Sequence, residues 1–198
     1  MTTPTVKRTA LFTYTYLICF VVFGLWQQNY EFIFYSFIIL SFLIATLLVY
    51  RHVELSSWII VSLSFFGLLH LAAGNVRING IRLYELAING GRYHFDNIVH
   101  FFGGLLVTLI LFNLLYPFID ERVQRRYIIF YGLVILMALG VGSINELVEF
   151  IAYLTFGVLV RVGDYYNNSL DIVFNTLGSI VAVVIIHLFS RRRVTLIE

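Results

Sequence analysis

Several residue types are scarce in this sequence, and each scarcity excludes a class of protein. The 198 residues include one cysteine, Cys19, so a disulfide framework within the chain and a thiolate metal site are both excluded. Only 12% of the residues are charged, against about a quarter in soluble domains, which excludes an ordinary water-soluble domain. The formal net charge of +2 is too small to suggest a nucleic-acid partner.

Apolar residues are abundant instead. Hydrophobic side chains make up 60% of the chain and aromatic ones 17%, and the mean hydropathy is +0.90. This composition is typical of an integral membrane protein. The 19 phenylalanines and 13 tyrosines are therefore expected to face lipid or to form aromatic belts at the membrane surfaces, not to bind a cofactor.

Six stretches are apolar over about the 20 residues that a helix needs to cross a bilayer. No small-residue cleavage site follows the first stretch, so we expect a spanning helix there and not a secretory signal. The sequence predicts an all-α integral membrane protein, with residues 1–198 forming one helical membrane domain. The six expected transmembrane helices cover residues 10–26, 32–50, 57–74, 97–117, 127–153 and 170–189.

The distribution of lysine and arginine predicts the orientation of the helices. With six spans both termini lie on one side, and nine of the 13 basic residues fall on that side. The remaining four, on the other side, are Arg77, Arg82, Arg92 and Arg161. Because cytoplasmic loops carry the excess of positive charge, we expect both termini in the cytoplasm of a multi-pass protein of the cell membrane.

The loop at residues 75–96 is then expected outside the cell. Asn79-Gly80 and Asn89-Gly90-Gly91 are turn signals, and the residues between them partly alternate apolar and polar. This pattern predicts a short hairpin or an irregular lid over the outer helix ends. An amphipathic interfacial helix is the alternative, which the glycines disfavour.

Ionisable residues in membrane spans are costly and tend to mark function or pairing. The cytoplasmic halves of the predicted spans hold almost none, whereas the seven acidic and histidine residues that are candidates for a site lie near the outer ends of the spans or in the outer loops. These seven residues are His70, Asp96, His100, Glu146, Glu149, Asp164 and Asp171. The sequence therefore predicts a polar site that faces the outside.

Helical spacing places several of these residues in pairs, three or four positions apart and hence on one helix face. The pairs are Asp96 with His100, Glu146 with Glu149, and Asp171 with Asn175. The fourth and sixth spans also share the pattern D-x-x-x-[H/N]-x-x-G. Gly103, Gly104 and Gly178 in or beside this pattern are expected to let helices approach closely.

Carboxylates and imidazoles together are ligands for zinc, manganese or magnesium. We expect His100, Glu146, Glu149 and Asp171 to be both ligands and catalytic groups. Asp96, His70 and Asp164 are further candidate ligands. Such a metal would activate water or polarise a phosphoryl oxygen. Without a metal, the crowded carboxylates would provide a general acid beside a general base.

Other polar residues are candidates for binding the substrate. Arg92 and Arg161 run against the positive-inside tendency, and arginine binds phosphate bidentately, so they are expected to hold an anionic headgroup or a glycan phosphate. Asn145, Asn168 and Asn175 are expected to orient the ligand or the carboxylates.

Structural roles compete with these assignments. Polar groups in a membrane bundle often join helices by hydrogen bonds. Asp96 and Asp171 are also candidate helix N-caps, which would not exclude a ligand role. His70 is equally a candidate for packing, and Arg161 for an ion pair with Asp164.

Three segments of the sequence resemble motifs of known membrane proteins: "FDNIVHFFGG" (95–104), "INELVEF" (144–150) and "NSLDIVFNTLGS" (168–179). They look like motifs of the VanZ-like family of small membrane proteins and of the related YjdF-type bacterial membrane proteins, over about residues 95–185. VanZ itself is associated with low-level teicoplanin resistance. The second glutamate, Glu149, where the family commonly has a glutamine nearby, favours the YjdF-type relatives. The resemblance implies that five residues are the polar positions typical of the family: Asp96, His100, Glu146, Asp171 and Asn175.

These features predict an outward-facing, metal-assisted membrane enzyme that acts at a phosphate ester of a lipid-linked or cell-envelope substrate. A non-catalytic binder of a lipid or a lipoglycopeptide antibiotic is the alternative. The bare cytoplasmic half disfavours an ion-coupled transporter, and in a purely structural bundle the cluster would affect stability only.

Overall fold

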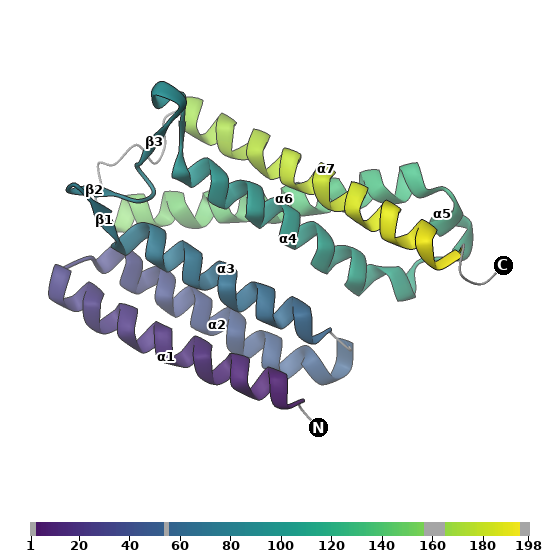
Figure 1. Ribbon diagram of the computed structural model, residues 1–198, viewed down its shortest axis with the longest axis horizontal. Helices are drawn as coiled ribbons and strands as arrows, with labels where there is room; N and C mark the ends of the chain where they lie inside the picture. Colours follow the sequence, from purple (N-terminus) through teal and green to yellow (C-terminus); the bar gives the residue numbers. More distant parts are fainter. Residues whose placement is uncertain (1–2, 54–55, 157–164, 195–198) are drawn as a thin grey trace. The chain divides into compact units, whose positions relative to one another are not determined.

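A computed structural model describes residues 3–53, 56–156 and 165–194, and most of this part is helical (Figure 1). Six of its helices are long and apolar enough to cross a membrane, as the sequence predicts. A short helix, α5, precedes α6. The helices are α1 (Pro4–Gln27), α2 (Tyr30–Val53), α3 (Ser57–Asn75), α4 (Phe95–Leu115), α5 (Glu121–Arg125), α6 (Tyr127–Phe156) and α7 (Tyr165–Val194).

Several helices extend beyond their apolar stretches, because backbone hydrogen bonding continues into polar residues at the ends. The α1 helix begins at Pro4 and not at residue 10. Proline suits the first helical turn, and the Thr3 hydroxyl accepts a hydrogen bond from the backbone N–H of Val6. The α7 helix begins at Tyr165 and not at residue 170, which moves part of the predicted outer loop into the helix.

The chain divides into two compact units. The first unit holds α1, α2, α3 and the segment up to Val99, together with the end of α6 from Glu149. The second holds α4 from His100, α5, α6 up to Val148, and α7. The boundaries therefore fall inside α4 and α6, each of which is one continuous helix.

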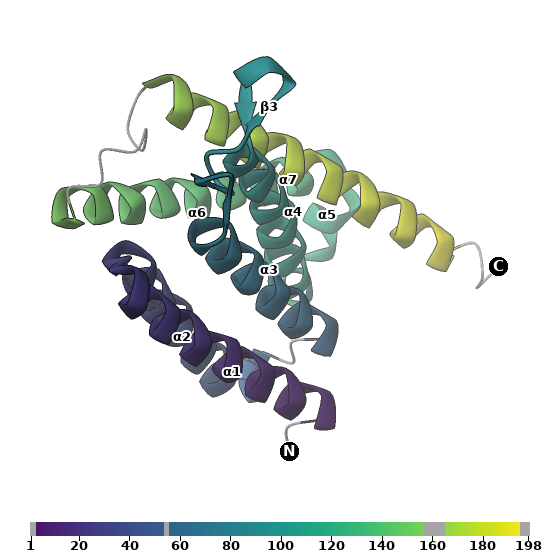
Figure 2. The same cartoon turned by 60° about the vertical axis from the view of Figure 1, so that its left-hand side comes forward.

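Polar contacts between helices hold the first unit together. The α1 and α2 helices lie side by side (Figure 2), and α3 packs on both. The hydroxyls of Thr13 and Ser64 are 2.7 Å apart, and the Tyr16 hydroxyl donates to the Ser64 carbonyl. At the other end of α3, the Asn29 amide donates to the side chain of Asn75. These buried hydrogen bonds set the contact of α1 and the α1–α2 turn with α3.

The segment between α3 and α4 forms two small hairpins, which confirms the prediction of a hairpin there. Strands β1 (Arg77–Ile78) and β2 (Ile81–Arg82) are antiparallel, as are β3 (Ala87–Ile88) and β4 (Tyr93–His94). Asn79 and Gly80 both have positive φ, as a two-residue hairpin turn requires. A 3-10 turn, η1 (Asn89–Gly91), joins β3 to β4. The alternative of an interfacial helix is wrong, because these turn residues reverse the chain.

Two glycines bring α4 and α7 into backbone contact in the second unit. A Cβ at Gly104 would overlap the backbone of Asn175, and a Cβ at Gly178 would overlap the carbonyl of Phe101. The Ser179 hydroxyl donates to the Asn175 carbonyl at 2.9 Å and also lies within hydrogen-bonding distance of the Gly104 carbonyl. The predicted close approach of helices is therefore confirmed at Gly104 and Gly178.

Candidate functional site

The candidate site centres on the imidazole of His100, in the second turn of α4. This ring is almost completely buried. Its Nδ1 atom lies 3.6 Å from Oε1 of Glu146 on α6, and its Nε2 atom lies 3.7 Å from Oδ1 of Asp171 on α7. Three helices of the second unit therefore place one imidazole between two carboxylates.

Two asparagines position these groups. The Asn167 amide donates to Oδ2 of Asp171 at 2.8 Å, one turn earlier on α7, and the Asp171 side chain has no exposed surface. The Asn175 amide nitrogen lies 3.3 Å from Nδ1 of His100. A Cβ at Gly142 on α6 would be only 3.0 Å from that amide, so α6 also confines it. The orientation of the His100 ring is thus set by neighbours on both other helices.

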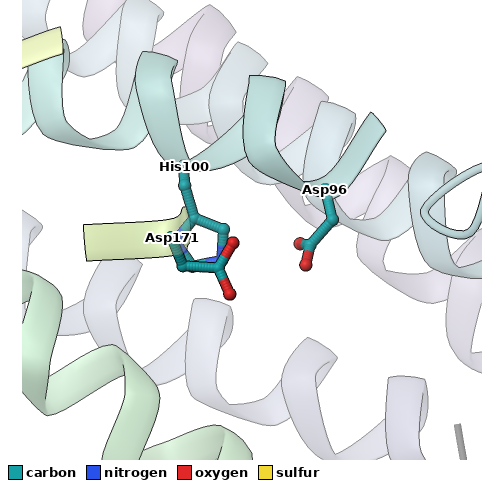
Figure 3. Close-up of side chains that lie close together, drawn as sticks. All are labelled: Asp96, His100 and Asp171. Atoms are coloured by element: carbon teal, nitrogen blue, oxygen red, sulfur yellow. The ribbon is translucent and has the colours of Figure 1, made fainter. Parts of the chain in front are cut away.

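Two further carboxylates lie on the same helices as His100 and Glu146, one turn away. Asp96 precedes His100 by one turn on α4, and Glu149 follows Glu146 by one turn on α6. Figure 3 shows Asp96, His100 and Asp171 close together. One ligand atom from each of these three lies within 4.8 Å of the others, and the same holds for His100, Glu146 and Glu149.

The spacing of the donor atoms suits a metal ion. Two ligands at about 2.1 Å from a tetrahedral zinc are about 3.4 Å apart. The two nitrogen–oxygen distances at His100, 3.6 and 3.7 Å, lie close to that separation and are too long for hydrogen bonds. Glu146 and Asp171 with a neutral imidazole carry two negative charges, which a divalent cation would cancel. In such a site one ring nitrogen of His100 would bind the metal while the other N–H faces a carboxylate.

Of the other predicted residues, some have described surroundings and others fall outside the described ranges. His70 on α3 pairs with Tyr84, whose hydroxyl is 2.5 Å from Nδ1 of the ring. Arg92 is exposed at the end of η1, and Asn145 is exposed on α6. Asn168 is half-buried in the first turn of α7. Arg161 and Asp164 fall outside the residues that the structure describes.

The expectation that Asp96 and Asp171 cap their helices is wrong. The α4 helix already begins at Phe95, and the side chain of Asn97 accepts the backbone N–H of His94, at 2.9 Å. Asn97 thus satisfies the backbone at the helix start, in the manner of the third residue of a capping box. Asp171 lies in the second turn of α7, where no N–H needs a cap.

The sequence reasoning missed three polar residues around this region. Asn97 is fully buried, and its spacing of three from His94 was the available signal. Asn167 precedes the predicted span of residues 170–189, although it lies one helical turn before Asp171. Tyr84 gave no local signal, because its partner His70 is distant in the sequence. Burial raises the pKa of the Tyr84 phenol well above its usual range, and the carboxylates of Asp96 and Glu149 add to the effect.

The chain belongs to a family of membrane proteins. The family model described as "Predicted membrane protein (DUF2238)" matches residues 8–192, which run from α1 into α7. No curated protein matches the chain, and no solved structure does. The family description agrees with the six apolar helices of the fold.

Proposed function

We propose that this membrane protein holds a divalent cation through His100 and Asp171, with Glu146 at the other nitrogen of the His100 ring, and uses the cation at a phosphate ester of a lipid-linked substrate. The observation that carries the proposal is the placement of one imidazole between two carboxylates, at 3.6 and 3.7 Å, by three different helices. Zinc, manganese and magnesium are the candidate metals, since all accept imidazole or carboxylate ligands.

The burial of the cluster supports a cation there. A carboxylate taken out of water costs several kcal/mol unless a positive charge and hydrogen bonds compensate it. Asp171 is fully buried, and the Asn167 amide donates a hydrogen bond to its Oδ2 atom. A protonated His100 would balance one of the two carboxylates, whereas a divalent cation would balance both. For these two carboxylates, a divalent ion is therefore the better match in charge.

The three residues differ in exposure, which suggests different roles. His100 and Asp171 are almost completely buried, and Glu146 is the more accessible of the two carboxylates. A bound cation would polarise a phosphoryl oxygen or lower the pKa of a water molecule. Glu146 is suited to accept a proton from that water, while His100 and Asp171 hold the ion. Asn175 keeps the His100 ring in place for this task.

The surroundings of the site suggest the class of substrate. The distribution of arginines favours a site on the outer side of the cell membrane, and helices that span the bilayer give lipids direct access from the side. The resemblance of three motifs to VanZ-like and YjdF-type proteins also supports a role at the cell envelope. A non-catalytic binder of a lipid or a lipid-bearing antibiotic is the second candidate, because that resemblance includes a resistance protein.

The first experiment measures the metal content of the detergent-purified protein by elemental analysis. We expect stoichiometric metal in the wild type and its loss in His100→Ala and Asp171→Asn. Glu121→Gln is the matched control, because Glu121 is an exposed carboxylate on α5. Size-exclusion profiles and circular dichroism would show that the variants remain folded. A folded wild type that takes up none of the three metals, even when each is resupplied, would refute the cation site.

A second experiment separates the enzyme from the binder. The metal-loaded protein would be incubated with phospholipids and polyprenyl phosphates in mixed micelles, and released phosphate or headgroup would be measured. We expect Glu146→Gln to lower the rate by about 10²- to 10⁴-fold, the usual contribution of a general base. If the wild type binds these lipids without turnover and Glu146→Gln binds them equally well, the protein is a binder.

A further inference from the structure

The β1–β2 hairpin of the first unit carries an exposed apolar face. Val76, Ile78 and Ile81 are 43%, 44% and 47% exposed. Val76 and Ile78 are two residues apart and so point to the same side, and Ile78 pairs directly with Ile81 across the hairpin. The three apolar side chains therefore form one small exposed surface. A hairpin that faced only water would gain nothing from such an apolar surface.

The base of the same hairpin is firmly anchored. Arg82 forms an ion pair of 3.0 Å with Glu31, and its guanidinium lies over the ring of Phe32. The backbone N–H of Leu83 donates to the Val76 carbonyl at 2.9 Å, and that of Tyr84 donates to the Ala73 carbonyl at 3.0 Å. The hairpin is thus a direct continuation of α3, and its exposed face has a fixed position.

The anchor also gives the level of the hairpin in the membrane. Glu31 is the second residue of α2, next to the exposed Tyr30 and close in sequence to the exposed Trp26 at the end of α1. Tryptophan and tyrosine at helix ends are typical of the membrane–water interface. The hairpin lies at this same end of the unit (Figure 1). The ion pair of Arg82 with Glu31 therefore holds the hairpin at the level of the aromatic belt.

We propose that the β1–β2 hairpin is a membrane-surface anchor, in which Val76, Ile78 and Ile81 enter the interfacial layer of the lipid and Arg77 binds lipid phosphate. Apolar side chains beside basic ones are the composition by which peripheral segments bind this layer. The exposed Arg77 guanidinium has five donors, one of which is directed to the Gly80 carbonyl. The positive charge of Arg77 complements an anionic lipid headgroup. Arg77 can bind this headgroup because it lies on the same hairpin as the three apolar side chains.

This anchor is independent of the proposed cation site. It involves the first unit only, and none of its residues is a proposed metal ligand. Its role would be to fix the level of the loop between α3 and α4 at the membrane surface. The alternative is that a second protein, and not lipid, covers this apolar face. Vesicles that contain only lipid and this protein would lack such a partner.

The test places a nitroxide spin label on the hairpin of the full-length protein in vesicles of phosphatidylcholine and phosphatidylglycerol. Cys19→Ser provides a background without other thiols, and Ile78→Cys and Ile81→Cys carry the label in separate variants. Phe42→Cys, exposed in the middle of α2, is the lipid reference, and Glu121→Cys is the water reference. Collision of each label with oxygen and with a neutral nickel chelate is then measured.

We expect both hairpin labels to collide more with oxygen than with the nickel chelate, with a ratio between the lipid and water references. Replacing phosphatidylglycerol by phosphatidylcholine should shift the ratio towards water, and Arg77→Gln should abolish that shift. Ratios at positions 78 and 81 equal to the water reference, in the presence of anionic lipid, would overturn the anchor and leave a protein partner as the occupant.

Discussion

The contact between α4 and α7 leads to the sharpest prediction about stability. At Gly178, alanine would place a Cβ against the carbonyl carbon and oxygen of Phe101 and the amide nitrogen of Leu105, all of which are backbone atoms. Backbone cannot rotate away as a flexible side chain can, so the helices must separate. Overpacking of this kind costs about 1–3 kcal/mol, and we expect the upper end of that range. Alanine also gains about 1 kcal/mol in helix propensity over glycine. The net expected loss for Gly178→Ala is therefore about 2 kcal/mol.

Gly140 on α6 is the matched control for this substitution. A Cβ at Gly140 would meet no atom within 4 Å, so Gly140→Ala should be neutral or should stabilise the fold by up to about 1 kcal/mol. The free energy of unfolding can be compared by titrating the two variants and the wild type with sodium dodecyl sulfate in mixed micelles. Equal stability of the two variants would refute the backbone contact. Because Asn175 and Asp171 lie on the same stretch of α7, Gly178→Ala should also weaken metal binding, whereas Gly140→Ala should not.

Two further predictions concern the first unit. Glu31→Gln should lower the free energy of unfolding by about 3 kcal/mol, the lower end for a broken buried pair, because the largely buried Arg82 guanidinium then keeps only the more distant Glu85 carboxylate, at 3.8 Å, as a counter-charge. Adding Arg82→Gln should recover most of this loss in a double-mutant cycle, and simply additive losses would argue against the pair. Since the pKa of Tyr84 is raised by burial, the folded state keeps the neutral phenol where the unfolded chain has begun to lose its proton, above pH 10.0. The stability from this phenol should be complete below that pH and decline above it. Tyr84→Phe should flatten the decline of the melting temperature between about pH 9 and pH 12, and unchanged slopes would contradict the assignment.

The helices could be predicted from the sequence because each one depends on local information. A spanning helix satisfies all of its backbone hydrogen bonds within one segment, so the length of an apolar run is sufficient to find it. The Asn79-Gly80 turn is local in the same way, since two residues with positive φ reverse the chain. The positions of the helix ends were predicted less accurately, as α7 shows. The helices extend into polar residues, which an apolar run does not include.

The grouping of the polar residues depends on contacts between distant segments. Helical spacing placed Asp171 and Asn175 on one face of α7, and it placed His100 on the face of α4 that carries Asp96. It could not show that His70 would pair with Tyr84, because that contact depends on where the loop folds back on α3. Nor could it show that Asn167 would orient Asp171, since this required the true start of α7.

The sequence by itself thus determined that the chain is a helical membrane protein with six apolar helices and acidic and histidine residues on three of them. Only the tertiary structure decided that His100 lies between Glu146 and Asp171. The physical reason is that side-chain periodicity is a property of one helix, whereas the distance between two side chains is set by how closely their helices pack. Gly104 and Gly178 determine that packing in the second unit, because the absence of a Cβ lets α4 and α7 meet backbone to backbone.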